Sequence, residues 1–221
     1  LQGQKIILAI DRAGFVGEDG ETHQGILDVP FINTIPNVTI YSPSTYSELR
    51  ADFVQAFYHS DGLVAVRYPR GAEKQLPNDF HFSVEPFDLY GDESCQIAVL
   101  AYGKEFAFAC EAKEKLQQQG IQIKIIKINR IKPIDSKIYD YLLPCRVVTF
   151  FEESERNGSV GEIVGAHLCR LGFGGKYRHI AVDNQFVCHA SVSSQLHKYH
   201  LDTDGIVEEI HSVLDEENEK T

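Results

Sequence analysis

The strongest constraint on the fold is the alternation of short apolar runs with amphipathic stretches along the whole chain. Runs such as KIILAI (5–10), LVAVRY (63–68) and QIAVLAYG (96–103) are rich in β-branched and other apolar residues, and they have the length of strands. A strand, helix, strand order favours parallel strands that are joined by right-handed crossovers. The sequence therefore predicts an α/β protein with mostly parallel sheets and helices on both faces.

The first part of the chain shows one complete unit of this kind. Residues 5–10 are predicted to form a buried strand of a parallel sheet, and a second strand begins at Val38. Ser44 is expected to cap the helix that follows. This helix carries one apolar stripe, because its large apolar residues recur at spacings of three and four: Tyr46, Leu49, Phe53 and Phe57.

Residues 72–94 lack this rhythm and combine prolines with mixed charge, so we interpret them as a linker. The alternation then restarts with a strand at 96–103, a helix at 105–119 and further strands at 121–128 and 146–153. A helix from Val160 to Leu171, a strand near 179–182 and an amphipathic tail from Thr203 complete it. We therefore predict a domain at 1–71, a linker at 72–94 and a second domain at 95–221.

Charge and cysteine usage exclude several classes of protein. The formal net charge is −11, from 21 Lys and Arg against 32 Asp and Glu, which argues against a protein that binds nucleic acid along its backbone. The five cysteines are widely spread and form no C-x-x-C pair, which is typical of reduced thiols. No apolar run has the length of a membrane-spanning helix. We expect a soluble, cytoplasmic protein that binds neither nucleic acid nor membranes.

The segment DRAGFVGEDGETHQG, residues 11–25, is the strongest candidate for a functional site. It follows the first strand, and RYPRG follows the strand at 63–68, so both lie where ligands gather in open α/β sheets. Arg12 and Arg70 are therefore able to converge on one phosphate or carboxylate. Asp19 lies four residues before His23, close enough for its carboxylate to orient an imidazole that exchanges a proton.

A structural interpretation of the same residues stays open on spacing alone. Asp19 and the glycine that follows it are typical of a tight turn, and His23 would then bind only backbone groups. Arg12 and Arg67 would, on this interpretation, form salt bridges with surface acids.

The motif in residues 11–25, together with IPNVTIYSPS at 35–44 and AVRYPRG at 65–71, resembles the 1-deoxy-D-xylulose-5-phosphate synthases, a family of thiamine-diphosphate enzymes in the transketolase superfamily. The later segment FFEESERNGSVGE, at 150–162, resembles a diverged form of the C-terminal domain of that family. The resemblance implies that 1–71 is the C-terminal part of a pyrimidine-binding domain and that 95–221 is a transketolase C-terminal domain.

The resemblance also implies a reaction and site residues. Enzymes of this family condense pyruvate with D-glyceraldehyde 3-phosphate, releasing carbon dioxide and forming a precursor of isoprenoids, thiamine and pyridoxal. Arg12 and Arg70 match the arginines that bind the aldehyde phosphate, and Asp19 and His23 match residues that contact the acceptor substrate. His23 is the residue we expect to transfer a proton to the developing alkoxide.

The family's cofactor-binding domain precedes the matched region. The resemblance therefore implies thiamine diphosphate and Mg²⁺ for a full-length homodimeric enzyme, whereas we expect neither of them to bind this chain, which would be inactive alone. The chain contains no Met and its first strand begins near Leu1, so we expect a piece of a longer polypeptide. Without the missing domain, we expect the loop at 11–25 to be loosely held.

Other polar residues receive weaker interpretations. His189 lies in VCHAS, where the family more often has an Ile-Pro-His-Gly type of sequence, and we expect a structural or interface position for it. Cys188 lacks a visible orienting group for a nucleophile. Glu152 and Glu153 are expected at a solvated strand end, with contact to a partner subunit as the alternative.

Two alternative functions stay open on the sequence. The chain resembles, less specifically, a β-type subunit of another transketolase-like 2-oxoacid enzyme, which would work with a separate partner. The second alternative is a non-catalytic assembly or binding subunit, in which the loop residues have no catalytic role.

Overall fold

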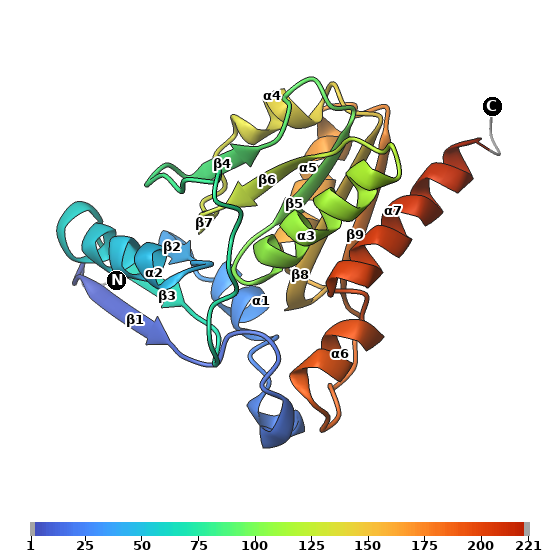
Figure 1. Ribbon diagram of the computed structural model, residues 1–221. Coiled ribbons are helices and arrows are strands. Elements are labelled where there is room, and N and C mark those ends of the chain that lie inside the picture. The colour runs from blue at the N-terminus through green and yellow to red at the C-terminus, as the bar shows by residue number, and fades with distance from the viewer. Residues whose placement is uncertain (1–2, 219–221) are drawn as a thin grey trace.

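Two sheets form the centre of the protein, which we describe from a computed structural model of residues 3–218 (Figure 1). The first sheet has the strand order β1-β3-β2-β7, and the second has the order β4-β6-β5-β8-β9. Most neighbouring strands are parallel, which confirms the predicted fold class. The strands are β1 (Ile6–Ile10), β2 (Val38–Tyr41), β3 (Leu63–Arg67), β4 (Phe87–Tyr90), β5 (Ile97–Ala101), β6 (Lys124–Ile128), β7 (Arg130–Lys132), β8 (Val147–Glu155) and β9 (Lys176–Val182).

Helices cover both faces of the second sheet. Helices α3 and α7 pack together on one face, while α5 packs on the other (Figure 1). The described helices are α1 (Asp28–Asn33), α2 (Tyr46–Val54), α3 (Glu105–Gln118), α4 (Ile138–Leu142), α5 (Val160–Arg170), α6 (Val192–Lys198) and α7 (Thr203–Asn218). Among residues 3–218, no helix has both the length and the apolar character that crossing a membrane requires.

The two sheets share one apolar core and exchange segments. Val29 of α1 and Ile40 of β2 belong to the same buried cluster as Leu100 and Phe150 of the second sheet. Strand β7 follows β6 along the chain but pairs with β2 of the first sheet. The segment interpreted as a linker contains β4, which pairs antiparallel with β6. The two halves of the chain are therefore tightly packed on each other.

Strand β1 differs from the predicted buried strand, and that prediction is wrong. It pairs only with β3 and forms the edge of the first sheet. Ile6 is 47% exposed and Leu8 is 38% exposed. An apolar run predicts the strand, but it does not show whether another element covers the face that carries these side chains.

Helix α2 packs on the first sheet through the middle of its predicted apolar stripe, where Leu49 and Phe53 contact a buried cluster, but it also buries an acidic face that the stripe did not indicate. Tyr46 and Phe57, at the two ends of the stripe, are both more than half exposed, whereas Glu48 and Asp52 are buried. Its N-cap is Thr45, whose side chain accepts a hydrogen bond from the backbone N–H of Glu48, so the expected cap at the preceding serine is also wrong. A buried cation from the second sheet attracts the acidic face, which is why polarity does not predict the packing here.

That cation is Lys127 of β6, whose side chain has no exposed surface. Its Nζ atom lies 2.8 Å from Glu48 Oε2 and also donates to the side-chain oxygen of Asn129. Asp52 lies beside this pair, and burial raises its pKa to about 8, with Lys127 acting in the opposite direction and Glu48 adding to the rise. The junction between the two halves therefore contains a buried ionic cluster.

The stability of the protein should depend on pH through Asp52. The folded chain holds the Asp52 proton from the ordinary pKa of 3.8 up to about 8, whereas the unfolded chain has lost it, so stability falls as pH rises through this window. From pH 6 to pH 8 we expect the free energy of unfolding of the wild type to fall by about 2 kcal/mol more than that of Asp52→Asn. Urea unfolding of both proteins at the two pH values measures this difference. Equal pH dependence in the two proteins would contradict the assignment.

Candidate functional site

The loop at 11–25 and the segment at 68–74 leave the same edge of the first sheet, because β1 and β3 are parallel. The backbone N–H of Ala13 donates to the carbonyl oxygen of Tyr68 over 3.0 Å, which joins the two segments directly. Arg12 has a φ of 64°, in the left-handed region that residues other than glycine rarely adopt. Strained backbone of this kind clusters at functional sites, where the surrounding structure holds it.

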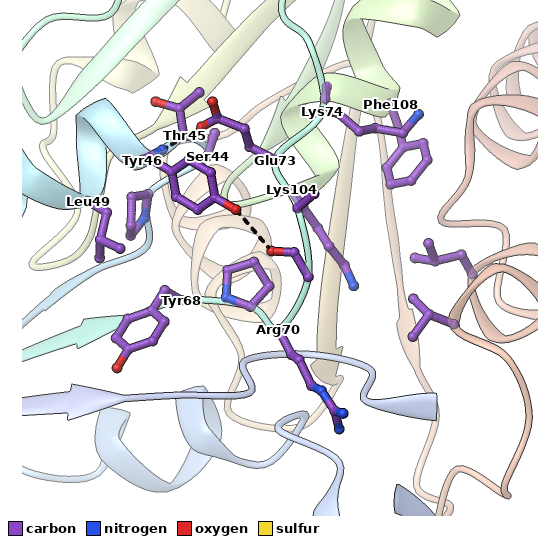
Figure 2. Close-up of a pocket in the computed structure, with 17 residues that line it drawn as sticks. Ser44, Thr45, Tyr46, Leu49, Tyr68, Arg70, Glu73, Lys74, Lys104 and Phe108 are labelled. Carbon is purple, nitrogen blue, oxygen red and sulfur yellow. Dashed lines mark hydrogen bonds between the residues drawn. The ribbon is translucent and has the colours of Figure 1, made fainter. Parts of the chain in front are cut away.

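Three of the four predicted site residues lie together. Asp19 Oδ2 is 2.9 Å from Arg70 Nη1 and 3.7 Å from Arg12 Nε. Both guanidinium groups are about half exposed, so they remain accessible to a ligand from solvent. Figure 2 shows the Arg70 side chain pointing away from a pocket that lies between α2 and α3. The two arginines therefore face one carboxylate, and their role in binding a substrate anion stays a prediction.

His23 is placed differently from the other three residues. Its side chain is exposed, and its Nδ1 atom lies 2.9 Å from the hydroxyl oxygen of Thr22. Asp19 instead interacts with the arginines, so the structure does not show the expected carboxylate–imidazole pair. The short 3-10 turns at Gly17–Asp19 and Glu21–His23 separate the two side chains.

The base of the loop is held by the C-terminal half of the chain. Glu153, near the end of β8, accepts a hydrogen bond from the backbone N–H of Phe15 over 3.2 Å. It also forms an ion pair with Lys104, with 2.7 Å between Lys104 Nζ and Glu153 Oε1. Gly14 lies directly on this carboxylate, since a Cβ atom at Gly14 would be 2.2 Å from Glu153 Oε2. The Phe15 ring is buried beside Tyr199. The expectation of a loosely held loop is therefore wrong for its base.

Arg67 holds the other end of the loop. It is buried at the end of β3, and its Nη2 atom donates to the carbonyl oxygens of Gly25 over 2.9 Å and Glu153 over 3.2 Å. Burial by itself would lower the pKa of Arg67, but the surrounding groups, among them Tyr102, Asp28 and Glu153, raise it. The guanidinium therefore stays charged. Arg67 Nε also lies 3.5 Å from Asp28 Oδ2, so Arg67 does form an ion pair, but with a largely buried acid and not one on the surface.

The two glutamates expected at a solvated strand end are buried, which corrects that prediction. Glu152 accepts hydrogen bonds from the hydroxyl of Tyr102 over 2.7 Å and the backbone N–H of Gly161 over 2.7 Å, and it lies 2.6 Å from His179 Nε2. Burial alone would raise the pKa of Glu152, but these hydrogen bonds hold it below its ordinary value. Glu152 therefore fastens β8 to its neighbours, whereas Glu153 fastens β8 to the loop.

Sequence reasoning missed the positioning roles of Arg67, Lys104 and Glu153. A charged residue that ends the apolar run LVAVR was the available signal for Arg67. Lys104 and Glu153 gave no local signal, because the contact of Glu153 with the loop and its ion pair with Lys104 both join residues far apart in the sequence. His189 and Cys188, by contrast, are exposed, and the structure assigns neither of them to this site.

A pocket of about 260 Å³ lies next to this site, between α2, the segment at 68–74, α3 and α6 (Figure 2). Arg70 belongs to its lining, but the Arg70 guanidinium binds Asp19 of the loop. Within the described part of the chain, no group of three His, Cys, Asp or Glu side chains is placed to hold a metal ion.

Comparison with sequence families identifies two matches. The family described as "Transketolase, pyrimidine binding domain" matches residues 1–74, and that described as "Transketolase, C-terminal domain" matches residues 90–206. Two curated relatives, both named 1-deoxy-D-xylulose-5-phosphate synthase, come from Shouchella clausii and Listeria monocytogenes. They are 32% and 33% identical over 99% and 96% of this chain. The chain spans only 35% and 36% of their lengths.

Solved structures show a similar fold. A protein described as "Split gene transketolase, inactive beta4 tetramer" has a TM-score of 0.78 at 22% identity, covering 95% of this chain and 67% of its own. A transketolase mutant from Pichia stipitis has a TM-score of 0.75 at 17% identity, covering 96% of this chain and 30% of its own. At these identities the likeness concerns the fold.

Proposed function

Because the chain belongs to the transketolase family through its pyrimidine-binding and C-terminal domains, we propose that it forms the aldehyde-phosphate side of the active site of a 1-deoxy-D-xylulose-5-phosphate synthase. The observation that carries the proposal is the convergence of Arg12 and Arg70 on the Asp19 carboxylate. Two guanidinium groups that share one anion are well suited to a phosphate, which accepts several charge-assisted hydrogen bonds.

The roles that we propose for these residues come from the resemblance to the family. Arg12 and Arg70 would bind the phosphate of D-glyceraldehyde 3-phosphate, and Asp19 would then move from the arginines to the acceptor substrate. His23 would transfer a proton to the developing alkoxide through Nε2, since Nδ1 already contacts Thr22. Glu153 and Arg67 act through the loop, which they hold from below.

Transketolase-family enzymes use thiamine diphosphate and Mg²⁺. Mg²⁺ keeps several waters and takes few carboxylates from a protein, and among the residues described here no group of three His, Cys, Asp or Glu side chains is placed to hold a metal ion. We propose that the cofactor-binding part lies on polypeptide outside this chain. We propose that the complete enzyme is a cytoplasmic homodimer and that the chain alone is inactive.

Binding of the aldehyde phosphate tests the assignment on the 221-residue chain. We expect Arg12→Ala and Arg70→Ala each to weaken the binding of D-glyceraldehyde 3-phosphate by about 10- to 100-fold, as measured by calorimetry, because each removes a charge-assisted contact. Arg50→Ala, an exposed change on α2, is the matched control. Unchanged affinity in both site variants would contradict the proposal.

Activity distinguishes the alternatives. Supplying the N-terminal part of a curated relative, with thiamine diphosphate and Mg²⁺, should give 1-deoxy-D-xylulose 5-phosphate from pyruvate and the aldehyde phosphate. A β-type subunit of another 2-oxoacid enzyme would instead turn over a 2-oxoacid without any dependence on the aldehyde phosphate. A non-catalytic subunit would bind its partner polypeptide and turn over neither substrate.

A further inference from the structure

Apart from Arg70, no residue that lines the pocket beside the site binds substrate in the proposed reaction. This pocket lies between the first residues of α2 and α3, with the segment at 68–74 along one side and α6 opposite (Figure 2). We call this cavity the junction pocket. Its volume of about 260 Å³ is enough for a small organic molecule, and both halves of the chain contribute to its walls.

The lining combines cations with an apolar wall. Lys74 belongs to the segment at 68–74 and Lys104 directly precedes α3, and their acidic partners, Glu111 and Glu153, are not part of the lining. Each ammonium group has three donors, so a single acidic partner leaves donors for a ligand. The ring of Phe108 provides an apolar surface, and Lys74 Nζ lies 4.0 Å from the centre of this ring.

A carboxylate of the chain itself already occupies an anion position in the junction pocket. Glu73 is exposed on the segment after β3, and its Oε2 atom accepts a hydrogen bond from the backbone N–H of Tyr46 over 2.6 Å. This N–H belongs to the first turn of α2, where the helix dipole favours negative charge. The hydroxyl oxygen of Ser44 beside it is buried and has no hydrogen-bond partner among residues 3–218.

We propose that the junction pocket binds a small organic oxyanion, a phosphate or carboxylate joined to a flat apolar body. The oxyanion displaces Glu73 from the N–H of Tyr46 and binds Lys104, while the apolar body lies against Phe108. This site is separate from the arginine pair, because Arg70 directs its guanidinium to Asp19. Occupancy links α2 to α3 across the junction of the two halves.

Phenyl phosphate is a suitable probe, with amide shifts of the ¹⁵N-labelled 221-residue chain as the readout. We expect shifts at 44–46, 72–74 and 104–108. Inorganic phosphate, which lacks the apolar body, should bind more weakly by about tenfold. Benzoate in place of phenyl phosphate shows whether a carboxylate serves as well as a phosphate. Shifts confined to 11–25 and Arg70, or equal affinity for phenyl phosphate and inorganic phosphate, would overturn the proposal.

Two variants make the test specific. Glu73→Gln removes the internal competitor from an exposed position, so it should tighten phenyl phosphate binding by about two- to fivefold. Phe108→Ala should weaken it by about fivefold. Arg12→Ala, outside the pocket, should leave this affinity unchanged even though it disables the proposed substrate site. If Phe108→Ala does not fold, Glu73→Gln decides, and unchanged or weaker binding in Glu73→Gln would overturn the proposal.

Discussion

Replacing Arg67 with methionine should destabilise the folded chain by about 3–5 kcal/mol, the usual cost of removing one partner from a buried charged network. Methionine leaves the carbonyl oxygens of Gly25 and Glu153 without their donor and leaves Asp28 without a nearby cation. Urea unfolding measures the loss. The exposed change Arg50→Met is the matched control, and it should alter stability by less than about 0.5 kcal/mol.

The same variant should also loosen the site loop before the protein unfolds. Hydrogen exchange at the amides of Ala13 and Phe15 should accelerate more than exchange in β5, because Arg67 and Glu153 hold the two ends of the loop. If Arg67→Met lowers the free energy of unfolding by less than about 1 kcal/mol and the loop amides stay protected from hydrogen exchange, Arg67 does not position the loop.

A comparable effect is expected at the junction of the two halves, where Lys127→Met should cost about 3–5 kcal/mol. The change leaves Glu48 buried without its cation. The double variant Glu48→Met with Lys127→Met should recover at least half of that loss, since an apolar pair of similar size removes both buried charges.

Unfolding should be measured at pH 6, where the raised pKa of Asp52 keeps this neighbour protonated, so that it adds no charge to the comparison. The single variant Glu48→Met completes the double-mutant cycle of Glu48 and Lys127. If the losses of the two single variants simply add in the double variant, Glu48 and Lys127 do not interact as a pair, and the junction is held by apolar packing instead.

Both predictions concern the same architectural property. The residues proposed to bind substrate lie on loops that leave the first sheet, and the loop at 11–25 is held by Arg67 of β3 and by Glu153 of β8, which pairs with Lys104 just before α3. A transketolase-type C-terminal domain is therefore part of the support for this site, and substitutions in it should affect substrate binding even where they touch no ligand.

Part of the site was predictable from residues alone. The position of Arg12 and Arg70 at one sheet edge follows from parallel strands, and the structure places both around Asp19. The spacing of Asp19 and His23 suggested a pair that the structure does not show, because Asp19 interacts with the two arginines and His23 with Thr22. The resemblance supplied the proposed roles, which spacing does not contain.

The sequence by itself determined the type and order of the main elements, because local periodicity and glycine punctuation act within a few residues. Only the tertiary structure decided which faces are covered. It exposes Ile6 at a sheet edge, buries the acidic side of α2 against Lys127 and turns Glu153 inward to the loop. Such outcomes depend on charges and neighbours far apart in the chain, and a local pattern does not record them.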